Sequence, residues 1–212
     1  MERTSFINGK FLPHSQCFIH IEDRGFQLAD GVYEVILLKN NKLIDLDWHL
    51  QRLFRSLTEL EIKFEQNKTY LEQTILELFA KNNLADGSVY LQITRGVANR
   101  QQIFPTNISP TITATVSPLK IINPQDLEND LSVQTHQDIR WQRCDIKSTS
   151  LLASCWIKQK AVEAGMDDAI LIRDGFITEA TFANVFIVDK NGTLITRNAD
   201  NFILQGITRN RL

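Results

Sequence analysis

Two stretches with helical spacing and one apolar face each, set among short β runs, constrain the fold of this chain most. Apolar residues recur at intervals of three and four from Leu50 to Leu60, and Asp45 and Asp47 stand where an N-terminal cap and a dipole partner belong. The second stretch begins with the T-x-x-E pattern Thr69–Glu72, which indicates a capping box. Each helix therefore has one side to bury against a sheet, and we expect a mixed α/β protein.

Asparagine-containing turns join several of the β runs. Hairpins are predicted at Asn8-Gly9, Asn40-Asn41 and Asn191-Gly192. Further strands are predicted at 89–94, 111–116, 131–135, 169–172 and 176–178, and a further helix at 149–164. The polar segment 95–110 between two strands is a long loop, and loops of this length are usually functional or disordered.

The periodic pattern lapses between Pro118 and Pro124, which indicates a domain boundary. We expect a small N-terminal α/β domain over 1–118, a linker over 119–123 and a larger cofactor-binding domain over 124–212. A helix start near Thr208 is followed by only four residues, so the second domain is predicted to be cut short at its C-terminus.

Composition favours a small-molecule partner. A net charge of -2, from 23 Lys+Arg against 25 Asp+Glu, argues against nucleic acid as a partner. No stretch approaches the roughly 18 apolar residues of a membrane span, and the first residues lack the apolar core of a signal peptide, so we expect no membrane partner and a cytoplasmic protein. The three cysteines and four histidines lack metal-ligand spacing, and no metal is predicted.

Lys147 is the candidate nucleophile. Burial beside Ile146 and like charge from Arg140 and Arg143 could disfavour its ammonium form and make it reactive towards a carbonyl group. Taken alone, Lys147 is more readily explained as a solvated surface lysine, because lysines are rarely fully buried.

Six segments taken together carry a more specific signal. They are 22–35, His49–Leu53, Thr94–Gly96, Arg143–Ser148, Thr178–Ala180 with Asn184–Phe186, and Gly206–Arg209. In these segments and their order the chain resembles the fold-type IV pyridoxal-phosphate enzymes, which comprise D-amino acid aminotransferases, branched-chain aminotransferases and aminodeoxychorismate lyases. It is most similar in motif to the first group. The resemblance implies the two-domain D-amino acid aminotransferase-like fold and pyridoxal 5'-phosphate as cofactor.

The resemblance also implies the cofactor-binding residues. Lys147 matches the catalytic lysine that binds the cofactor covalently and then moves a proton on the substrate. Glu179 matches the carboxylate that keeps the pyridine nitrogen protonated. The other implied cofactor-binding residues belong to the phosphate site and the segment leading into it: Arg52, Leu204, Ile207 and Thr208.

Fewer residues match the family at the substrate. Tyr33 resembles the tyrosine that helps to hold the substrate carboxylate, and Arg100 matches an arginine that reaches the same group from the partner subunit, which implies a homodimer. Gln102 stands where D-amino acid aminotransferases have histidine, and it cannot become a cation. Phe182 interrupts what is usually a run of serines, so the substrate set is open.

The predicted function is an aminotransferase that moves the amino group of a D-amino acid such as D-alanine to a 2-oxo acid. An aminodeoxychorismate lyase that releases pyruvate is the first alternative, and a branched-chain aminotransferase the second. A non-catalytic binding module that folds and dimerises without cofactor is an alternative of a different class.

Overall fold

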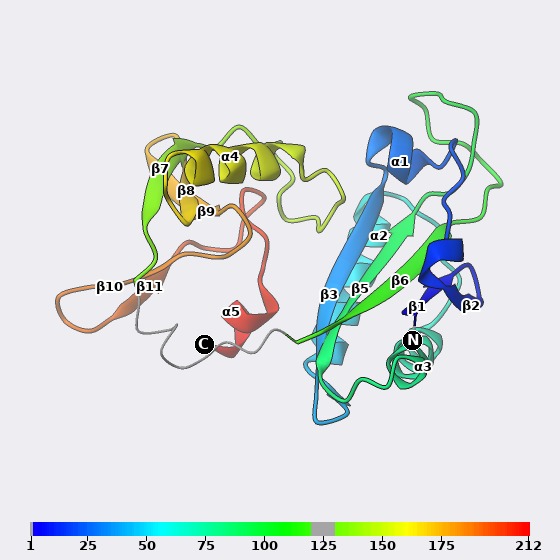
Figure 1. The fold of residues 1–212 in the computed structure, drawn as a ribbon. Coiled ribbons are helices and arrows are strands. Elements are labelled where there is room, and N and C mark those ends of the chain that lie inside the picture. Colours follow the sequence, from blue (N-terminus) through cyan, green and yellow to red (C-terminus); the bar gives the residue numbers. More distant parts are fainter. Residues whose placement is uncertain (1, 120–129) are drawn as a thin grey trace. The chain divides into compact units, whose positions relative to one another are not determined.

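A computed structural model describes residues 2–119 and 130–212 (Figure 1). Contacts divide the chain into one unit of residues 1–121 together with Lys147–Thr149, and a second unit of residues 122–146 and 150–212. All but the first residue of the predicted 119–123 linker lies outside the described residues. The sequence did not predict that Lys147–Thr149 belongs with the first unit.

The first unit is built on a six-stranded antiparallel sheet with the order β2-β1-β6-β5-β3-β4. Its strands are β1 (Thr4–Ile7), β2 (Lys10–Pro13), β3 (Gly31–Lys39), β4 (Lys42–Leu43), β5 (Gly87–Thr94) and β6 (Thr111–Pro118). Both hairpins predicted in this half are present. Asn8 and Gly9 have φ of 46° and 84°, and Asn40 and Asn41 have φ of 50° and 57°, as two-residue hairpin turns require.

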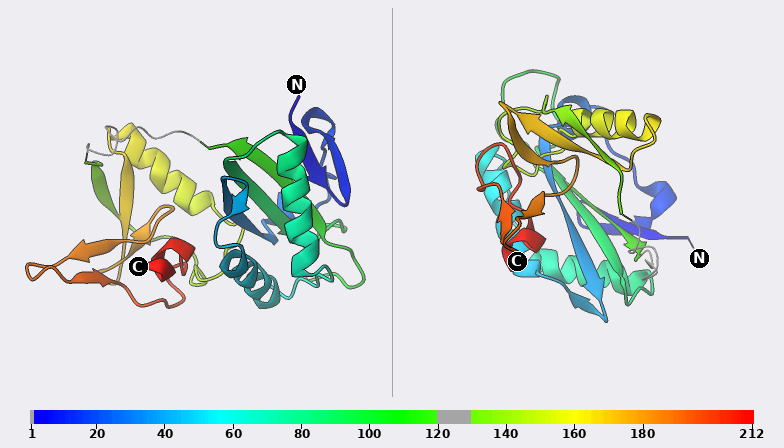
Figure 2. Two further views of the ribbon diagram at one scale, coloured as in Figure 1. Left: turned by 90° about the horizontal axis from the view of Figure 1, so that it is seen from below. Right: turned by 90° about the vertical axis from the view of Figure 1, so that its left-hand side faces the viewer.

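Helices α2 (Leu46–Glu59) and α3 (Lys68–Lys81) cover one face of this sheet, α2 against β3 and α3 against β1 and β6 (Figure 2). The predicted apolar residues Leu50, Leu53 and Leu57 of α2 are buried, as are Leu71, Ile75, Leu78 and Phe79 of α3. Leu46 is buried as well, before the predicted stretch, whereas Phe54 and Leu60 within it are only partly buried. Each buried apolar side chain contributes roughly 1.5–3 kcal/mol, so this face is the main core of the unit.

Both predicted helix caps need correction. Asp45 occupies the N-cap position of α2 with a left-handed backbone, φ 54°, and its side chain makes no capping hydrogen bond. Helix α3 begins before Thr69, and the Asn67 side chain accepts from Tyr70 N at 2.9 Å. The capping box at Thr69–Glu72 is therefore wrong, because Asn67 already satisfies an amide of the first turn.

Two short helices were not predicted from the sequence, η1 (His14–Gln16) and α1 (Arg24–Leu28). Asp23 caps α1 by accepting from Gly25 N at 2.8 Å, and Ala29 ends it with a left-handed φ of 54°. Five residues are too few to show a helical period, so only the cap could have indicated α1.

The second unit contains a three-stranded sheet, a two-stranded hairpin and two helices. They are β7 (Val133–Gln137), α4 (Leu152–Glu163), β8 (Asp168–Arg173), β9 (Phe176–Ala180), β10 (Phe186–Val188), β11 (Leu194–Thr196) and α5 (Ile207–Arg211). Strands β7 and β8 are parallel, and α4 between them buries Ile157 and Ala161 against Ala169 and Leu171. Helix α4 begins later than the predicted residue 149, because Thr149 N donates to Gly31 O of β3 instead.

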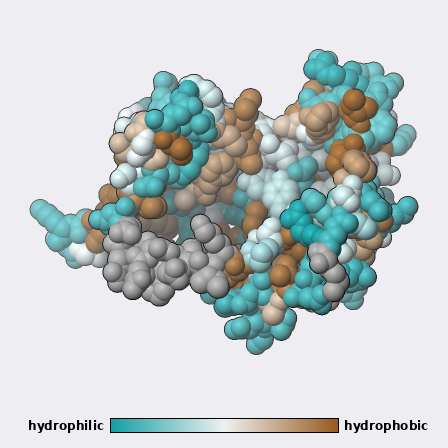
Figure 3. All heavy atoms as spheres, in the orientation of Figure 1, coloured by the Kyte–Doolittle hydropathy of each residue, from teal (hydrophilic) through white to brown (hydrophobic). Residues whose placement is uncertain are grey.

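Exposed apolar side chains gather near α1 and the loop after β5. Figure 3 shows brown, apolar surface in this part of the first unit, and Phe26, Ile103 and Phe104 are 72%, 70% and 50% exposed. Exposed apolar patches often mark interaction surfaces. Among the described residues, none of the helices has the length and apolar character needed to cross a membrane.

Candidate active site

The segment Lys147–Thr149 lies along the edge of β3. Tyr33 N donates to Lys147 O at 3.0 Å, and Ser148 forms an antiparallel bridge with Val32. Lys147 N donates to the buried hydroxyl of Ser56 on α2 at 3.2 Å. The backbone of Lys147 is therefore held by both the sheet and a helix of the first unit, which fixes where its side chain starts.

The structure brings the predicted residues Lys147 and Tyr33 together. Lys147 is half-buried, and its Nζ lies 4.3 Å from the centroid of the Tyr33 ring. Tyr33 is 8% exposed and stacks on Tyr90 with 5.3 Å between ring centroids. Stacking leaves the Tyr33 ring little freedom, so it forms a fixed wall beside the Lys147 amine.

Lys147 and the two arginines near it in the sequence each interact with carboxylates. Arg140 pairs with Asp138 and Glu179 in the second unit, and Arg143 pairs with Asp145 at 3.0 Å. Glu34 interacts electrostatically with Lys147 within the first unit. An effect of the two arginines on the charge of Lys147 stays a prediction.

Glu34 forms a buried ionic cluster with α2. Glu34 is 0% exposed. It lies on the side of β3 that faces the helices and that also carries Val32. The carboxylate accepts from Arg52 Nε and Nη2, both at 2.7 Å, and from His49 Nδ1 at 2.8 Å. Burial alone raises the pKa of Glu34, but the hydrogen bonds from Arg52 and His49 outweigh burial and hold this pKa below its ordinary value. Any phosphate contact by Arg52 is therefore additional to this ion pair.

Replacement of Glu34 by Gln should destabilise the protein by about 3 kcal/mol at neutral pH, because Arg52 would keep a buried charge without its partner. The pKa of Glu34 is lower in the folded than in the unfolded state. Its stabilisation is therefore present above pH 4.5 and is lost as the pH falls through the folded pKa. Urea unfolding of both proteins across this range should show the difference shrinking in acid. Exposed Glu77→Gln is the control, and a difference that does not depend on pH would contradict the assignment.

Glu179, at the end of β9, lies in a second buried cluster. Its carboxylate accepts from Leu204 N and from Asn184 Nδ2, both at 3.1 Å, and from Arg140 Nη1. Burial raises the pKa of Glu179, and the charge of Arg140 counters this only in part. The structure thus joins two of the predicted cofactor-binding residues through a hydrogen bond from the Leu204 backbone amide to the Glu179 carboxylate.

Asp138 and Arg140 extend the buried ionic cluster around Glu179. Arg140 donates from Nε and Nη2 to the two Asp138 oxygens, both at 2.9 Å, and Thr178 Oγ1 donates to Asp138 at 2.9 Å. Burial alone raises the pKa of Asp138, but the hydrogen bonds and charge of Arg140 outweigh burial and lower this pKa. Burial alone lowers the pKa of Arg140, but the carboxylates of Asp138 and Glu179 outweigh burial and raise it. Asp138 and Arg140 are therefore favoured in their charged forms despite their burial.

The start of α5 is tied to Glu179 through Asn184. Asn184 Nδ2 donates to Leu204 O at 2.8 Å, and its Oδ1 accepts from Gly206 N at 3.2 Å. A Cβ on Gly206 would lie 2.3 Å from that oxygen, so a larger residue here would displace the Asn184 side chain. Gly206 is the N-cap residue of α5 and has no side chain that could accept a hydrogen bond from the first turn. The backbone amides of Ile207 and Thr208 therefore have no side-chain cap.

A donor on the next residue also lacks a partner. Arg209 Nε is buried and has no hydrogen-bond partner among the described residues. Uncapped amides and an unpaired cationic donor at one helix start are the chemistry that an anion requires, so the donor set fits a phosphate group.

The remaining predicted substrate residues are exposed. Arg100 and Gln102 project from the loop after β5 in the first unit. Phe182, 56% exposed, lies in a tight turn of the second unit that is closed by a 2.7 Å hydrogen bond from Ala180 N to Ala183 O. These three side chains are open to a ligand or to another protein chain.

The sequence did not predict the residues that form ion pairs and hydrogen bonds with the candidate residues Arg52 and Glu179: Glu34, His49, Asp138 and Arg140. A signal for the first cluster was present. Glu34 shares one face of a strand with apolar Val32 and Ile36, so its carboxylate points into the core and needs a cationic or hydrogen-bonding partner there. His49 and Arg52, three residues apart, share one face of the facing helix.

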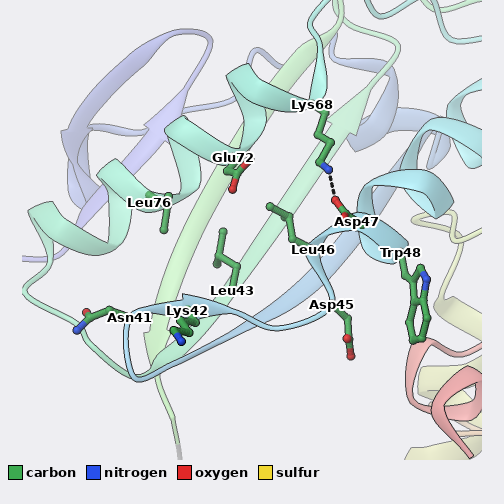
Figure 4. Close-up of a pocket in the computed structure, with 10 residues that line it drawn as sticks. All are labelled: Asn41, Lys42, Leu43, Asp45, Leu46, Asp47, Trp48, Lys68, Glu72 and Leu76. Atoms are coloured by element: carbon green, nitrogen blue, oxygen red, sulfur yellow. Dashed lines mark hydrogen bonds and ion pairs between the residues drawn. The ribbon is translucent and has the colours of Figure 1, made fainter.

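A polar groove lies away from these residues, between β4, the start of α2 and α3. It has a volume of about 700 Å³, and Figure 4 shows Lys42, Asp47, Trp48 and Glu72 among its walls, with an ion pair between Lys68 and Asp47. None of the predicted site residues lines it.

Comparisons with known proteins identify the family of this chain. The family model for amino-transferase class IV matches residues 31–212. D-alanine aminotransferase of Bacillus licheniformis is 43% identical over 203 residues, covering 95% of this chain and 71% of that protein. D-alanine aminotransferase of Staphylococcus haemolyticus is 38% identical, covering 96% of this chain and 72% of that protein.

Solved structures show the same fold. The branched-chain amino acid aminotransferase of Escherichia coli has a TM-score of 0.89 at 20% identity, covering 100% of this chain and 73% of that chain. A putative 4-amino-4-deoxychorismate lyase of Legionella pneumophila has a TM-score of 0.81 at 25% identity, with 93% and 72% covered. The predicted mixed α/β aminotransferase fold is confirmed. From the family match and the identities, this chain belongs to the class IV aminotransferases.

Proposed function

We propose that this chain transfers the amino group of a D-amino acid such as D-alanine to a 2-oxo acid, with pyridoxal 5'-phosphate as its cofactor. The observation that carries the proposal is the placement of Lys147 Nζ at 4.3 Å from the Tyr33 ring, in a chain 37–43% identical to proteins named D-alanine aminotransferase. The likeness to branched-chain aminotransferases and to the lyase is one of fold, at 19–25% identity.

The cofactor, when bound, supplies an electron-withdrawing ring that stabilises negative charge on the substrate carbon. Lys147 is proposed to hold the cofactor and to carry the proton on its Nζ. The backbone bonds of Lys147 to β3 and to Ser56 support this role, because they limit the positions from which the amine can act. Tyr33, beside the Lys147 amine, is proposed to help hold the substrate carboxylate.

Residues of the second unit are also proposed to bind the cofactor. Glu179 would face the pyridine nitrogen as a carboxylate that Arg140 helps to keep ionised. The amides of Ile207 and Thr208, with Leu204 in the segment before them, would hold the phosphate. Arg52 is proposed to add a further phosphate contact while it stays paired with Glu34.

The substrate carboxylate is proposed to bind Arg100 and Gln102. Both are exposed here, so they would act across the interface of a homodimer. The apolar surface of Phe26, Ile103 and Phe104 near the same loop supports such an interface. Phe182 is proposed to make one wall of the substrate site apolar. A cytoplasmic location also stays a prediction.

The expected activity is formation of pyruvate from D-alanine only when 2-oxoglutarate is present. Purified protein, reconstituted with pyridoxal 5'-phosphate, should develop a visible absorption band and give no pyruvate with L-alanine. Pyruvate released from aminodeoxychorismate without an acceptor would establish the lyase instead, and L-leucine as the preferred donor would establish the branched-chain enzyme. A protein that stays colourless would support the binding module.

A further inference from the structure

Two arginines share one buried aspartate at the root of the loop that follows β5. Asp30 Oδ2 accepts from Arg24 Nε at 2.7 Å and from Arg95 Nε at 2.8 Å, and its Oδ1 accepts from Arg95 Nη2 at 3.0 Å. The side chains of Arg24, Arg95 and Asp30 are 3%, 6% and 9% exposed. This cluster carries one more positive than negative charge, so its stability depends on how the remaining donors are used.

The remaining donors bind backbone oxygens, and one of these lies in the loop. Arg24 Nη1 donates to Gln101 O at 2.7 Å. Arg95 donates to Leu60 O and Glu61 O at 2.6 and 2.8 Å, and its guanidinium carbon lies 3.7 Å from the centroid of the Phe104 ring. The cluster therefore holds the loop at residue 101 through Arg24 and at residue 104 through Arg95.

The first residues of the loop are held as well. Arg24 N donates to Gly96 O at 2.9 Å, and Asp23 forms an antiparallel bridge with Val97. Gly96 has φ 111°, and a Cβ there would lie 2.0 Å from Ser109 O. Both ends of the loop thus meet at a position that only glycine can occupy.

We infer that Arg24, Asp30 and Arg95 are positioning residues that present Arg100 and Gln102 to the substrate carboxylate, an inference that rests on the proposed function. The fixed carbonyl of Gln101 lies between these two residues in the chain. Because the loop is ordered before substrate arrives, the entropic cost of ordering it does not weaken substrate binding.

Arg24→Met tests the inference, because methionine keeps an unbranched apolar side chain and removes the donors to Gln101 O and Asp30. Hydrogen exchange of the backbone amides of 96–104 should become at least about tenfold faster, with β5 and β6 unchanged. In the cofactor-loaded enzyme, KM for D-alanine should rise about tenfold while kcat stays within about twofold. Arg55→Met, on the exposed part of α2, is the matched control and should change neither measurement.

Phe104→Ala provides a second test if Arg24→Met does not fold, since the Phe104 side chain is half exposed. It should speed exchange in 96–104 by a smaller factor, about threefold. Unchanged exchange in either folded variant would overturn the anchor, and faster exchange with an unchanged KM would overturn its role in substrate binding. A wild-type protein that binds cofactor but does not convert D-alanine would instead overturn the proposed function, and with it the substrate role.

Discussion

Lys147→Ala should lower turnover of D-alanine by about 10³-fold or more and remove the visible absorption band of the bound cofactor. Lys147 supplies the only amine proposed to bond the cofactor and to carry the proton, so no other group is expected to compensate. Its main-chain contacts to Tyr33 and Ser56 do not involve the side chain and would remain. The free energy of unfolding of the apo-protein should therefore change by less than about 1 kcal/mol.

Lys39→Ala is the matched control for this experiment. Lys39 is exposed on β3, where it pairs with Asp86, and its loss should leave both the band and the turnover unchanged. Measured together, absorbance, steady-state rate and urea unfolding separate loss of chemistry from loss of fold. A Lys147→Ala enzyme with the wild-type band would show that another residue holds the cofactor.

Arg140→Met should cause a large loss of stability, about 3–5 kcal/mol in the free energy of unfolding. The change removes the cation that two buried carboxylates share, Asp138 and Glu179, although Asp138 keeps its ion pair with Arg173 at 3.2 Å. The pKa of Glu179 should rise further than in the wild type, because the charge and hydrogen bond of Arg140 are the largest effects that lower it. Denaturant unfolding at neutral pH measures the loss.

Arg143→Met is the matched control, since Arg143 lies only three residues away but is 40% exposed and pairs with partly exposed Asp145. Its loss should cost less than about 1 kcal/mol. The double variant Asp138→Asn/Arg140→Met should lose less free energy of unfolding than the two single variants lose in sum. Asp138 and Arg140 bind each other directly, and the double variant removes one of the carboxylates that Arg140→Met leaves without this partner. Equal losses for the two arginine variants would contradict the proposed chain of charges.

Sequence periodicity predicted most of the framework. The apolar stripes of α2 and α3 and the turns at Asn8-Gly9 and Asn40-Asn41 lie where the pattern placed them, because both signals depend on neighbours within about four residues. The caps were less predictable. Asn67 and Thr69 are both acceptable N-caps, and only the packed helix shows which residue accepts from the first turn.

Recognition of the motifs in their order determined the family, and the candidate residues Lys147 and Glu179 follow from it. Only the tertiary structure decided what surrounds them. It placed Lys147 on β3 beside Tyr33, and it paired Arg52 with Glu34 and Arg140 with Asp138. The physical reason is that a buried charge must find its partner wherever the fold brings one within hydrogen-bond distance, and a one-dimensional pattern does not record that distance.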